Sequence, residues 1–337
     1  MRVLLASSKF SGAQAPTPQL PPIPTLVVFF SPYHDITNGM DWNSNSKVMY
    51  TRVTGSSMPV TRAMLSNNQV LTWAFATGEC GSETWANVSP SALVTDNVQA
   101  FVAADKKYII SAGGHNGMFK CSSVSGFDKF IKTYDSSSLA GVDLDIEGGA
   151  YVQSDVNDLV RCVQAAQASY PHLRFSFTLP TLGADSLDDQ LGIPGMWVLE
   201  AIKSHGLSWT NLFFNLMTMD YGPPSKNVCT LGSDGKCDMG ASAVSAAKAL
   251  HSHWNVPYSN IELTPMIGGK DDRSVFTMAD ASTVTSFACS FGLGGVHFWS
   301  LDRDKDCPTG PALETCNNYD KAGTLGFTKA FLNGTGW

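Results

Sequence analysis

The strongest constraint on the fold of this chain is the segment 139–148, which reads Leu-Ala-Gly-Val-Asp-Leu-Asp-Ile-Glu-Gly. Its three acids, Asp143, Asp145 and Glu147, fall at every second position, and aliphatic residues separate them. A period of two is typical of a β-strand, so we expect the carboxylates to share one face and the aliphatic side chains the other. At a rise of ~3.3 Å per residue, neighbouring carboxylates on that face lie about 6.6 Å apart.

Such a row of acids has consequences for protonation. Three carboxylates on one face repel one another, so their pKa values are pushed apart and one of them can hold a proton near neutral pH. The alternative is an exposed edge strand with a solvated acidic face. The aliphatic opposite face and the Gly148-Gly149 ending favour a buried strand, and therefore a site of acid–base chemistry.

Strand-like and helix-like segments alternate along the chain. Eight short apolar runs have the length of strands: Thr25–Ser31, Gln69–Ala76, Lys107–Gly113, Leu139–Glu147, Leu173–Leu179, Asn211–Met219, Ile261–Gly268 and Gly295–Ser300. Between them lie six amphipathic runs: Ser91–Ala104, Val124–Tyr134, Ser154–Ser169, Gly195–His205, Ala241–His253 and Met278–Phe291.

Eight strand–helix units predict an α/β fold of the (β/α)8 TIM barrel type, as a single catalytic domain over residues 25–337. Residues 1–24 are predicted to be an irregular tail or a remnant of a signal or linker. The alternative is a doubly wound open sheet that binds a dinucleotide. That fold needs a glycine-rich loop after its first strand, and here the strand is followed by Pro32-Tyr33-His34.

Composition narrows the possible partners. The chain carries 22 Lys and Arg against 29 Asp and Glu, a net charge of −7, and has no basic run, so we expect no nucleic acid and no membrane partner. We also expect a monomer that uses no metal and no cofactor. His34 and His115 are isolated from other ligand-type residues in the sequence, and none of the 8 cysteines forms a C-x-x-C pair.

The cysteines favour an oxidising compartment. Cys229 with Cys237, and Cys307 with Cys316, each bracket a short polar loop that suits a local disulfide. Cys80 and Cys121 follow two successive predicted strands and could pair, whereas Cys162 and Cys289 lie in apolar helical patterns as buried thiols. We therefore predict a secreted protein, although the apolar core of the N-terminal segment is short for a secretion signal.

In a barrel of this type the active site lies where the strands end. Glu147 is then the acid nearest the mouth and the candidate proton donor, with Asp145 one layer deeper and Asp143 deeper still. Acids on one strand approach a substrate from one side only, so they cannot easily supply a nucleophile on the opposite side as well. We also expect Tyr33 and Trp85, in the loops of the first two strands, to contact substrate.

Several motifs together resemble family-18 glycoside hydrolases, specifically their bacterial-type chitinases. The segment 140–147 is similar to the family's catalytic motif, with Ala140 where the motif has Asp. Ser111-Ala112-Gly113-Gly114 is similar to its Ser-x-Gly-Gly motif. The run 217–222, Met-Thr-Met-Asp-Tyr-Gly, resembles the Met-x-Tyr-Asp motif, and Trp299 resembles the tryptophan beneath the distorted sugar. The likeness covers about residues 25–305.

The resemblance implies a role for each matching residue. Glu147 would be the general acid/base, Asp145 the carboxylate that turns toward it or toward the acetamido N–H, and Asp143 the inner carboxylate. Because Met219 occupies the usual Tyr place, we expect Tyr221 to supply the tyrosyl hydroxyl. The remaining matches would bind substrate: Trp299, Asp220, Met217, Met219, Ser111, Gly113 and Gly114.

The predicted function is that of a secreted chitinase. It would cleave β-1,4 bonds between N-acetylglucosamine units in chitin and its oligomers, internally and with retention of the anomeric configuration. The mechanism would be substrate-assisted, because attack by the substrate's own 2-acetamido oxygen replaces the nucleophile that acids on a single strand cannot easily supply. One alternative is an endo-β-N-acetylglucosaminidase that acts on N-glycans. Another is a non-catalytic, lectin-like barrel that binds chitin. The intact Glu147 argues against the lectin, whereas Ala140 and Met219 keep that reading open.

Overall fold

The computed structural model describes residues 27–65, 69–148, 150–269, 274–308, 310–319 and 321–336. Its main sheet has nine parallel strands in the order β1-β15-β12-β11-β10-β9-β7-β5-β2. Their bounds are β1 (Phe29–Phe30), β2 (Tyr33–Asp35), β5 (Val70–Ala76), β7 (Lys107–Gly113), β9 (Leu139–Asp145), β10 (Arg174–Pro180), β11 (Leu212–Met217), β12 (Ile261–Thr264) and β15 (Gly295–Val296).

The two ends of this sheet belong to one stretch of chain, so the sheet closes on itself. β1 pairs with β15 and β2 pairs with β5, and only Ser31 and Pro32 separate β1 from β2. Main-chain hydrogen bonds continue across that gap, with the Ser31 N–H donating to Val296 and the Thr72 N–H donating to the Pro32 carbonyl. Proline has no N–H to donate, which interrupts the first strand without opening the barrel.

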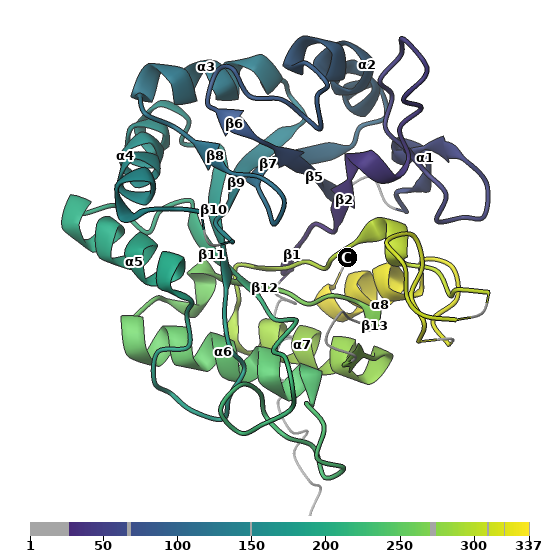
Figure 1. Ribbon diagram of the computed structural model, residues 1–337, viewed down its shortest axis with the longest axis vertical. Coiled ribbons are helices and arrows are strands. Elements are labelled where there is room, and N and C mark those ends of the chain that lie inside the picture. Colours follow the sequence, from purple (N-terminus) through teal and green to yellow (C-terminus); the bar gives the residue numbers. More distant parts are fainter. Residues whose placement is uncertain are drawn as a thin grey trace, which may run out of the picture.

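Helices surround the barrel on its outside (Figure 1). They are α1 (Val60–Ala63), α2 (Pro90–Ala103), α3 (Val124–Tyr134), α4 (Gln153–Ser169), α5 (Ile193–His205), α6 (Met239–Trp254), α7 (Met278–Phe291) and α8 (Gly326–Thr335). Three 3-10 turns are η1 (Ile36–Asn38), η2 (Tyr258–Asn260) and η3 (Leu301–Arg303). The helices begin at side-chain caps where the sequence offers them, such as Ser89 before α2 and Asp238 before α6.

The chain is thus a (β/α)8 barrel, and the predicted fold class is confirmed. Each of the eight predicted strands and six predicted helices corresponds to an observed element, although five strands end sooner than predicted. In particular, β9 ends at Asp145, so Glu147 lies just past the strand. Residues 1–24 lie outside the described residues, so the division between tail and barrel stays a prediction. The sequence reading missed the short helix α1 and the C-terminal helix α8.

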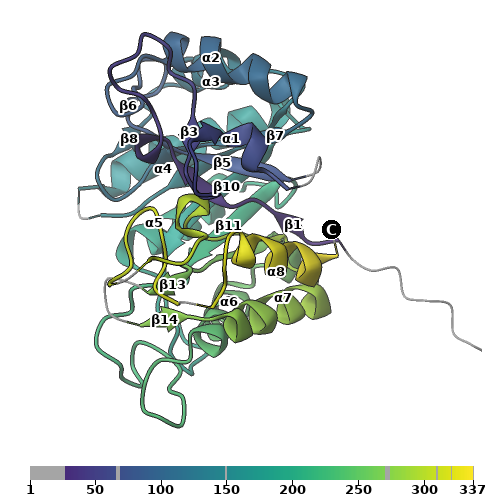
Figure 2. The ribbon, with the colours of Figure 1, turned by 90° about the vertical axis from the view of Figure 1, so that its right-hand side faces the viewer.

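The C-terminal helix is attached through a buried carboxylate. Asp304 accepts hydrogen bonds from the backbone N–H groups of Phe327 and Thr328 and from the Thr328 hydroxyl. These are the free donors of the first turn of α8, which a negative side chain satisfies. The helix then lies beside α7 and covers β1 (Figure 2).

The barrel interior is polar, unlike its apolar outer surface. Along β9, Val142 and Leu144 are buried in the hydrophobic core, whereas Asp143 and Asp145 share the face that points into the barrel. There Asp143 accepts a hydrogen bond from Ser176, and Asp145 lines the cavity. Near the opposite end, Arg174 pairs with the buried Glu262, and its guanidinium stacks on Phe29. The predicted period-two division of the β9 side chains is therefore confirmed.

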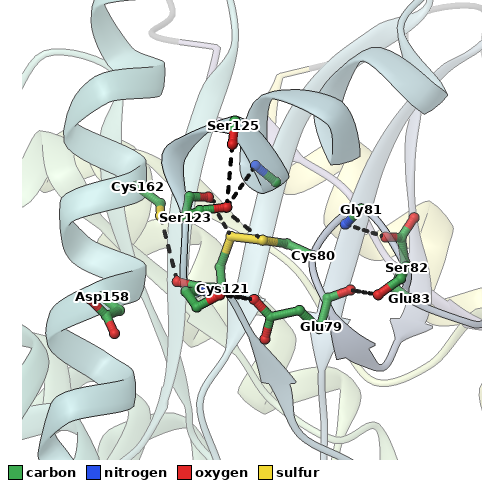
Figure 3. The surroundings of a disulfide bond; sticks show 12 residues. Glu79, Cys80, Gly81, Ser82, Glu83, Cys121, Ser123, Ser125, Asp158 and Cys162 are labelled. Atoms are coloured by element: carbon green, nitrogen blue, oxygen red, sulfur yellow. Dashed lines mark hydrogen bonds between the residues drawn. A yellow bond between two sulfur atoms is a disulfide. The ribbon is translucent and has the colours of Figure 1, made fainter.

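Three short antiparallel or parallel pairs decorate the barrel. They are β3 (Tyr50–Thr51) with β4 (Met58–Pro59), β6 (Gly78–Glu79) with β8 (Phe119–Lys120), and β13 (Gly268–Gly269) with β14 (Val275–Phe276). The β6–β8 pair carries the disulfide Cys80–Cys121 at its end, with a Cα–Cα distance of 5.0 Å (Figure 3). The Cys162 thiol donates to the Cys121 carbonyl beside it.

The other cysteines pair as predicted, although the free Cys289 is only partly buried, whereas a buried thiol was expected. Cys229 is bonded to Cys237 and Cys307 to Cys316, while Cys162 and Cys289 are free thiols. No helix in the part of the chain that the structure describes is long and apolar enough to span a membrane.

Candidate active site

A cavity of about 1100 Å³ opens where the barrel strands end. Its lining includes three acids: Asp145 at the end of β9, Glu147 just past that strand, and Asp220 in the loop after β11. A volume of this size is at the upper end of the range for ligand sites. The carboxyl ends of the parallel strands are also where barrel enzymes build their active sites.

Asp143, the deepest of the three acids in the row, is fully satisfied. Its Oδ2 accepts hydrogen bonds from the hydroxyls of Tyr33 (2.9 Å) and Ser111 (2.6 Å). Its Oδ1 accepts from the hydroxyls of Ser176 (2.6 Å) and Thr178 (2.7 Å). Burial raises the pKa of Asp143 while these hydrogen bonds lower it. With its lone pairs engaged, Asp143 is suited to anchoring the centre of the barrel.

Asp145 is held differently, because one of its two carboxylate oxygens has no hydrogen-bond partner among the described residues. The residue is 3% exposed, and within the described residues its Oδ1 has no hydrogen-bond partner. Burial, followed by the charges of Glu147 and Asp143, raises the pKa of Asp145 well above its ordinary value. A buried carboxylate oxygen without a donor costs free energy, so it is poised to accept a hydrogen bond from a ligand or to share a proton.

Glu147 lies at the mouth, with its side chain 21% exposed. Burial raises its pKa, the charge of Asp220 raises it further, and nearby His115 lowers it. The His115 Nδ1 is 3.7 Å from the Glu147 Oε2. A carboxyl whose pKa is raised by burial beside other acids can deliver a proton at mildly acidic or neutral pH.

Aromatic rings form the floor of the cavity. Trp299, just past β15, stacks on Phe75 at a centroid distance of 5.6 Å and an interplanar angle of 8°. Tyr33 lies 6.1 Å from Trp299, and all three rings line the cavity. Such a floor presents apolar faces that suit the C–H surface of a pyranose ring.

The Ser-x-Gly-Gly motif supports the site from below. A Cβ on Gly113 would lie 2.1 Å from the Asp145 carbonyl oxygen, and one on Gly114 would lie 2.7 Å from the Phe75 ring. Both glycines have φ above +80°, so a side chain would also be strained there. Gly113 lines the cavity, but Gly114 and the buried Ser111 do not, so the prediction that these two contact substrate is wrong.

Two further predictions are corrected by the structure. Trp85 is 0% exposed, and its indole N–H donates to the Tyr134 hydroxyl, so it belongs to the core between the loops and the helices. Tyr221 is buried outside the cavity, where its hydroxyl would lie 2.8 Å from a Cβ placed on Gly183. The strand alternation assumed for Tyr221 is broken, because β11 ends at Met217 and Asp220 has a left-handed φ of 50°.

The remaining predicted residues, apart from the deeper Asp143, come together around one cavity. Its lining includes Tyr33, Gly113, Asp145, Glu147, Met217, Met219, Asp220 and Trp299. The sequence reading missed Phe75, which is the one half-buried residue of the apolar strand β5, and it assigned no function to His115. His34 is buried against Asp302, and the described residues contain no cluster of three side chains that could hold a metal ion.

Comparisons with known proteins agree with this geometry. No protein-family model matches the chain. Endochitinase 11 of Metarhizium anisopliae is 28% identical over 306 residues, which are 82% of this chain and 54% of that protein. A probable bifunctional chitinase/lysozyme of Escherichia coli strain K12 is 27% identical over 290 residues, 78% of this chain and 31% of that protein. The chain spans about half or less of these relatives.

A solved structure matches almost end to end. The catalytic domain of a hyperthermophilic chitinase from Pyrococcus furiosus superposes with a TM-score of 0.68 at 25% identity, covering 94% of this chain and 96% of that domain. The chain is therefore similar to chitinase catalytic domains over almost its whole length, which supports the predicted resemblance to family 18 of the glycoside hydrolases. Catalytic-site mutants of the active domain 2 of the Pyrococcus furiosus chitinase, complexed with chito-oligosaccharides, match with a TM-score of 0.67.

One departure of this chain from the family-18 motif lies away from the cavity. Ala140, which stands where the motif has Asp, is the second residue of β9 and does not line the cavity. Asp145 and Glu147, five and seven positions later, do. The departure from the motif therefore lies at the N-terminal end of β9 and leaves the acids at the mouth of the cavity in place.

Proposed function

We propose that this chain is a chitinase that cleaves β-1,4 bonds within chitin and chito-oligosaccharides, by a retaining mechanism in which the substrate's acetamido group is the nucleophile. The observation that carries the proposal is the pairing of Asp145 with Glu147. One acid is buried with an unpartnered oxygen, and the other lies partly exposed above it in the same cavity. This pair can supply one proton and one acceptor on a single side of a sugar.

The first step begins with protonated Glu147. It donates its proton to the glycosidic oxygen while the bond from that oxygen to the anomeric carbon breaks. The carbonyl oxygen of the 2-acetamido group forms a new bond to the anomeric carbon, which yields an oxazolinium ion and a free leaving sugar. Asp145, whose Oδ1 lacks a donor among the described residues, accepts the acetamido N–H and so orients the attacking oxygen.

The second step returns the enzyme to its starting state. Glu147, now a carboxylate, takes a proton from a water molecule as the water oxygen bonds to the anomeric carbon and the oxazoline ring opens. Two inversions at that carbon give net retention. Asp143, fixed by four hydroxyl groups, holds the floor of the barrel beneath Asp145 during both steps.

Binding of the sugar ring is assigned to the aromatic floor and to the residues after β11. The stacked pair of Trp299 and Phe75 would lie beneath the pyranose ring. Met217, Met219 and Asp220, which also line the cavity, would surround the acetamido group. Because the Tyr221 side chain is buried elsewhere, Tyr33 presents a tyrosyl hydroxyl at this floor, and that hydroxyl donates to Asp143.

We further propose that the protein is secreted and acts as a monomer without a cofactor. The three disulfides support an oxidising compartment, since such bonds persist mainly outside the cytosol. The relative from Metarhizium anisopliae is named an endochitinase, which supports internal cleavage.

The test is product analysis on N-acetylglucosamine hexamer by proton NMR during the first minutes of hydrolysis. We expect cleavage at internal bonds, with the new reducing ends appearing first as the β-anomer before they mutarotate. Initial α-anomers would exclude the retaining mechanism. If the protein instead binds the hexamer and releases no product, it is a lectin-like barrel. If it cleaves only a high-mannose glycoprotein, its substrate is the N-glycan core.

A further inference from the structure

His115 lines the cavity, and the mechanism above gives it no role. Among the described residues that line the cavity, it is the one whose side chain can carry a positive charge, and it faces acids from several elements. Its neighbour Glu147 also interacts electrostatically with Asp220 after β11 and with Tyr151 before α4, and Asp145 lies below it on β9. The carboxylate that Glu147 becomes during the reaction therefore forms in a negatively charged environment.

The backbone on either side of His115 is anchored, although the His115 side chain is 80% exposed. It lies in a short loop between β7 and β8. The Gly114 N–H donates to the Asp145 carbonyl at 3.2 Å, and the Gly117 N–H donates to the Gly114 carbonyl at 3.4 Å. At the far end, the Phe119 N–H donates to the Tyr151 hydroxyl at 3.1 Å.

The disulfide strengthens this hold. β8 pairs with β6, and Cys80–Cys121 ties the two strands immediately after that pair (Figure 3). The loop that carries His115 is thus anchored to the catalytic strand β9 at one end and to a cross-linked strand pair at the other. A side chain on such a loop can act on Glu147 at a defined distance.

That distance indicates an electrostatic role. At 3.7 Å, the His115 Nδ1 and the Glu147 Oε2 are too far apart for a direct hydrogen bond but close enough for an ion pair. We propose that His115 is a positioning residue whose positive charge stabilises the Glu147 carboxylate after the proton has passed to the leaving sugar. This rests on the proposed function. A glycan in the cavity would exclude water and strengthen the attraction.

The direction of the pH effect follows from the sign of the charge. Burial is the main influence on the pKa of Glu147 and raises it, and His115 works against that rise. Removing the positive charge should raise the pKa of Glu147 further. The alkaline limb of the kcat/KM profile, which reports loss of the catalytic proton from the free enzyme, should then move to higher pH.

The experiment compares His115→Gln, His115→Lys and the unmodified protein on chitopentaose across pH. His115→Gln should move the alkaline limb upward and lower kcat at the optimum about two- to fivefold, the range for an exposed charge pair. His115→Lys, which keeps a charge, should restore the limb. The control is His172→Gln, an exposed histidine outside the cavity, which should change neither quantity.

Two results would overturn the inference. One is an alkaline limb that stays in place in His115→Gln, even if KM rises, since that would assign His115 to binding alone. The other is an equal movement of the limb in His115→Gln and His115→Lys, since charge would then be irrelevant.

A readout that does not need activity separates this inference from the proposed function. The Glu147 carboxyl can be titrated by ¹³C NMR in glutamate-labelled protein, with Glu147→Gln used to assign its signal. Its midpoint should rise in His115→Gln relative to the unmodified protein. A raised midpoint in a protein that does not hydrolyse chitin would leave the His115–Glu147 coupling standing and overturn the chitinase proposal, whereas an unchanged midpoint in an active enzyme would overturn only the role of His115.

Discussion

Replacing Glu147 with glutamine is expected to lower kcat on chitopentaose by about 10²–10⁴-fold and to change KM by no more than a few-fold. Glutamine keeps the size and hydrogen-bonding capacity of the side chain but cannot donate a proton to the leaving oxygen. The effect should be large because Glu147 is the acid at the mouth of the cavity whose pKa is raised by burial. Steady-state rates on chitopentaose measure both constants.

A matched control distinguishes this loss from a general effect of the substitution. Glu200→Gln makes the same chemical change on the exposed surface of α5, outside the cavity, and should leave kcat within experimental error. Near-normal hydrolysis by Glu147→Gln would assign the proton donor to another residue, and Asp220 would be the next candidate because it lines the same cavity.

The second large effect is expected for Asp145→Asn, with a fall in kcat of about 10²–10³-fold, the range for loss of one preorganised polar group. The carboxylate accepts the acetamido N–H in the proposed mechanism and stabilises the positive oxazolinium ion, whereas a neutral amide does neither equally well. Its buried Oδ1 has no partner among the described residues, so the substitution breaks no hydrogen bond of that oxygen. The decrease should therefore appear in the rate of the chemical step. Single-turnover kinetics on chitopentaose would isolate the chemical step.

Folding must be separated from catalysis in this variant. Asp143 accepts hydrogen bonds from four hydroxyls, so its replacement would disturb the barrel. The Oδ1 of Asp145 has no such partners among the described residues. We therefore expect Asp145→Asn to keep the thermal midpoint within a few degrees of the unmodified protein. Asp158→Asn, on the exposed face of α4, provides the control for rate. Equal rates in Asp145→Asn and the control would remove Asp145 from the mechanism.

The barrel and its acid row were predictable because local pattern determines both. Alternation of acids with aliphatic residues places Asp143 and Asp145 inside the barrel, and the succession of strands and helices determines that the sheet is parallel. That the sheet closes into a barrel could be inferred from the fold type, but the strand pairing that closes it could not be inferred from the sequence. The way in which Pro32 splits the first strand between two neighbours depends on contacts with β15 and β5, which are far away in sequence.

The errors at the site have physical causes that local pattern does not contain. Tyr221 leaves the cavity because Asp220 adopts a left-handed conformation, which ends the period-two geometry. Trp85 is buried in the core, where its indole N–H donates to the hydroxyl of Tyr134, a helix residue 49 positions later in the sequence. Phe75 was missed because it lies in an apolar strand and reads as core, although it is the residue of β5 that remains half exposed.

The two glycines of the Ser-x-Gly-Gly motif show the same limit in another form. Glycine at these positions indicates a tight turn, but the reason that a side chain is excluded there becomes clear only from the neighbouring residues in the structure. Gly113 makes room for the backbone of Asp145, and Gly114 for the ring of Phe75. His115 directly follows these glycines, and its proposed role is visible only in the structure. There its Nδ1 lies 3.7 Å from the Glu147 Oε2, which belongs to a residue that follows a different strand.

The claim on which this account depends is that the glycan supplies its own nucleophile, and one measurement addresses it directly. A pair of chito-oligosaccharides, identical except that one carries glucosamine in place of the N-acetylglucosamine unit at the cleaved bond, is hydrolysed side by side. We expect cleavage at that bond to slow by about 10³-fold or more in the glucosamine compound, because that compound lacks the preplaced intramolecular nucleophile. Cleavage of the same bond at equal rates in both compounds would contradict it.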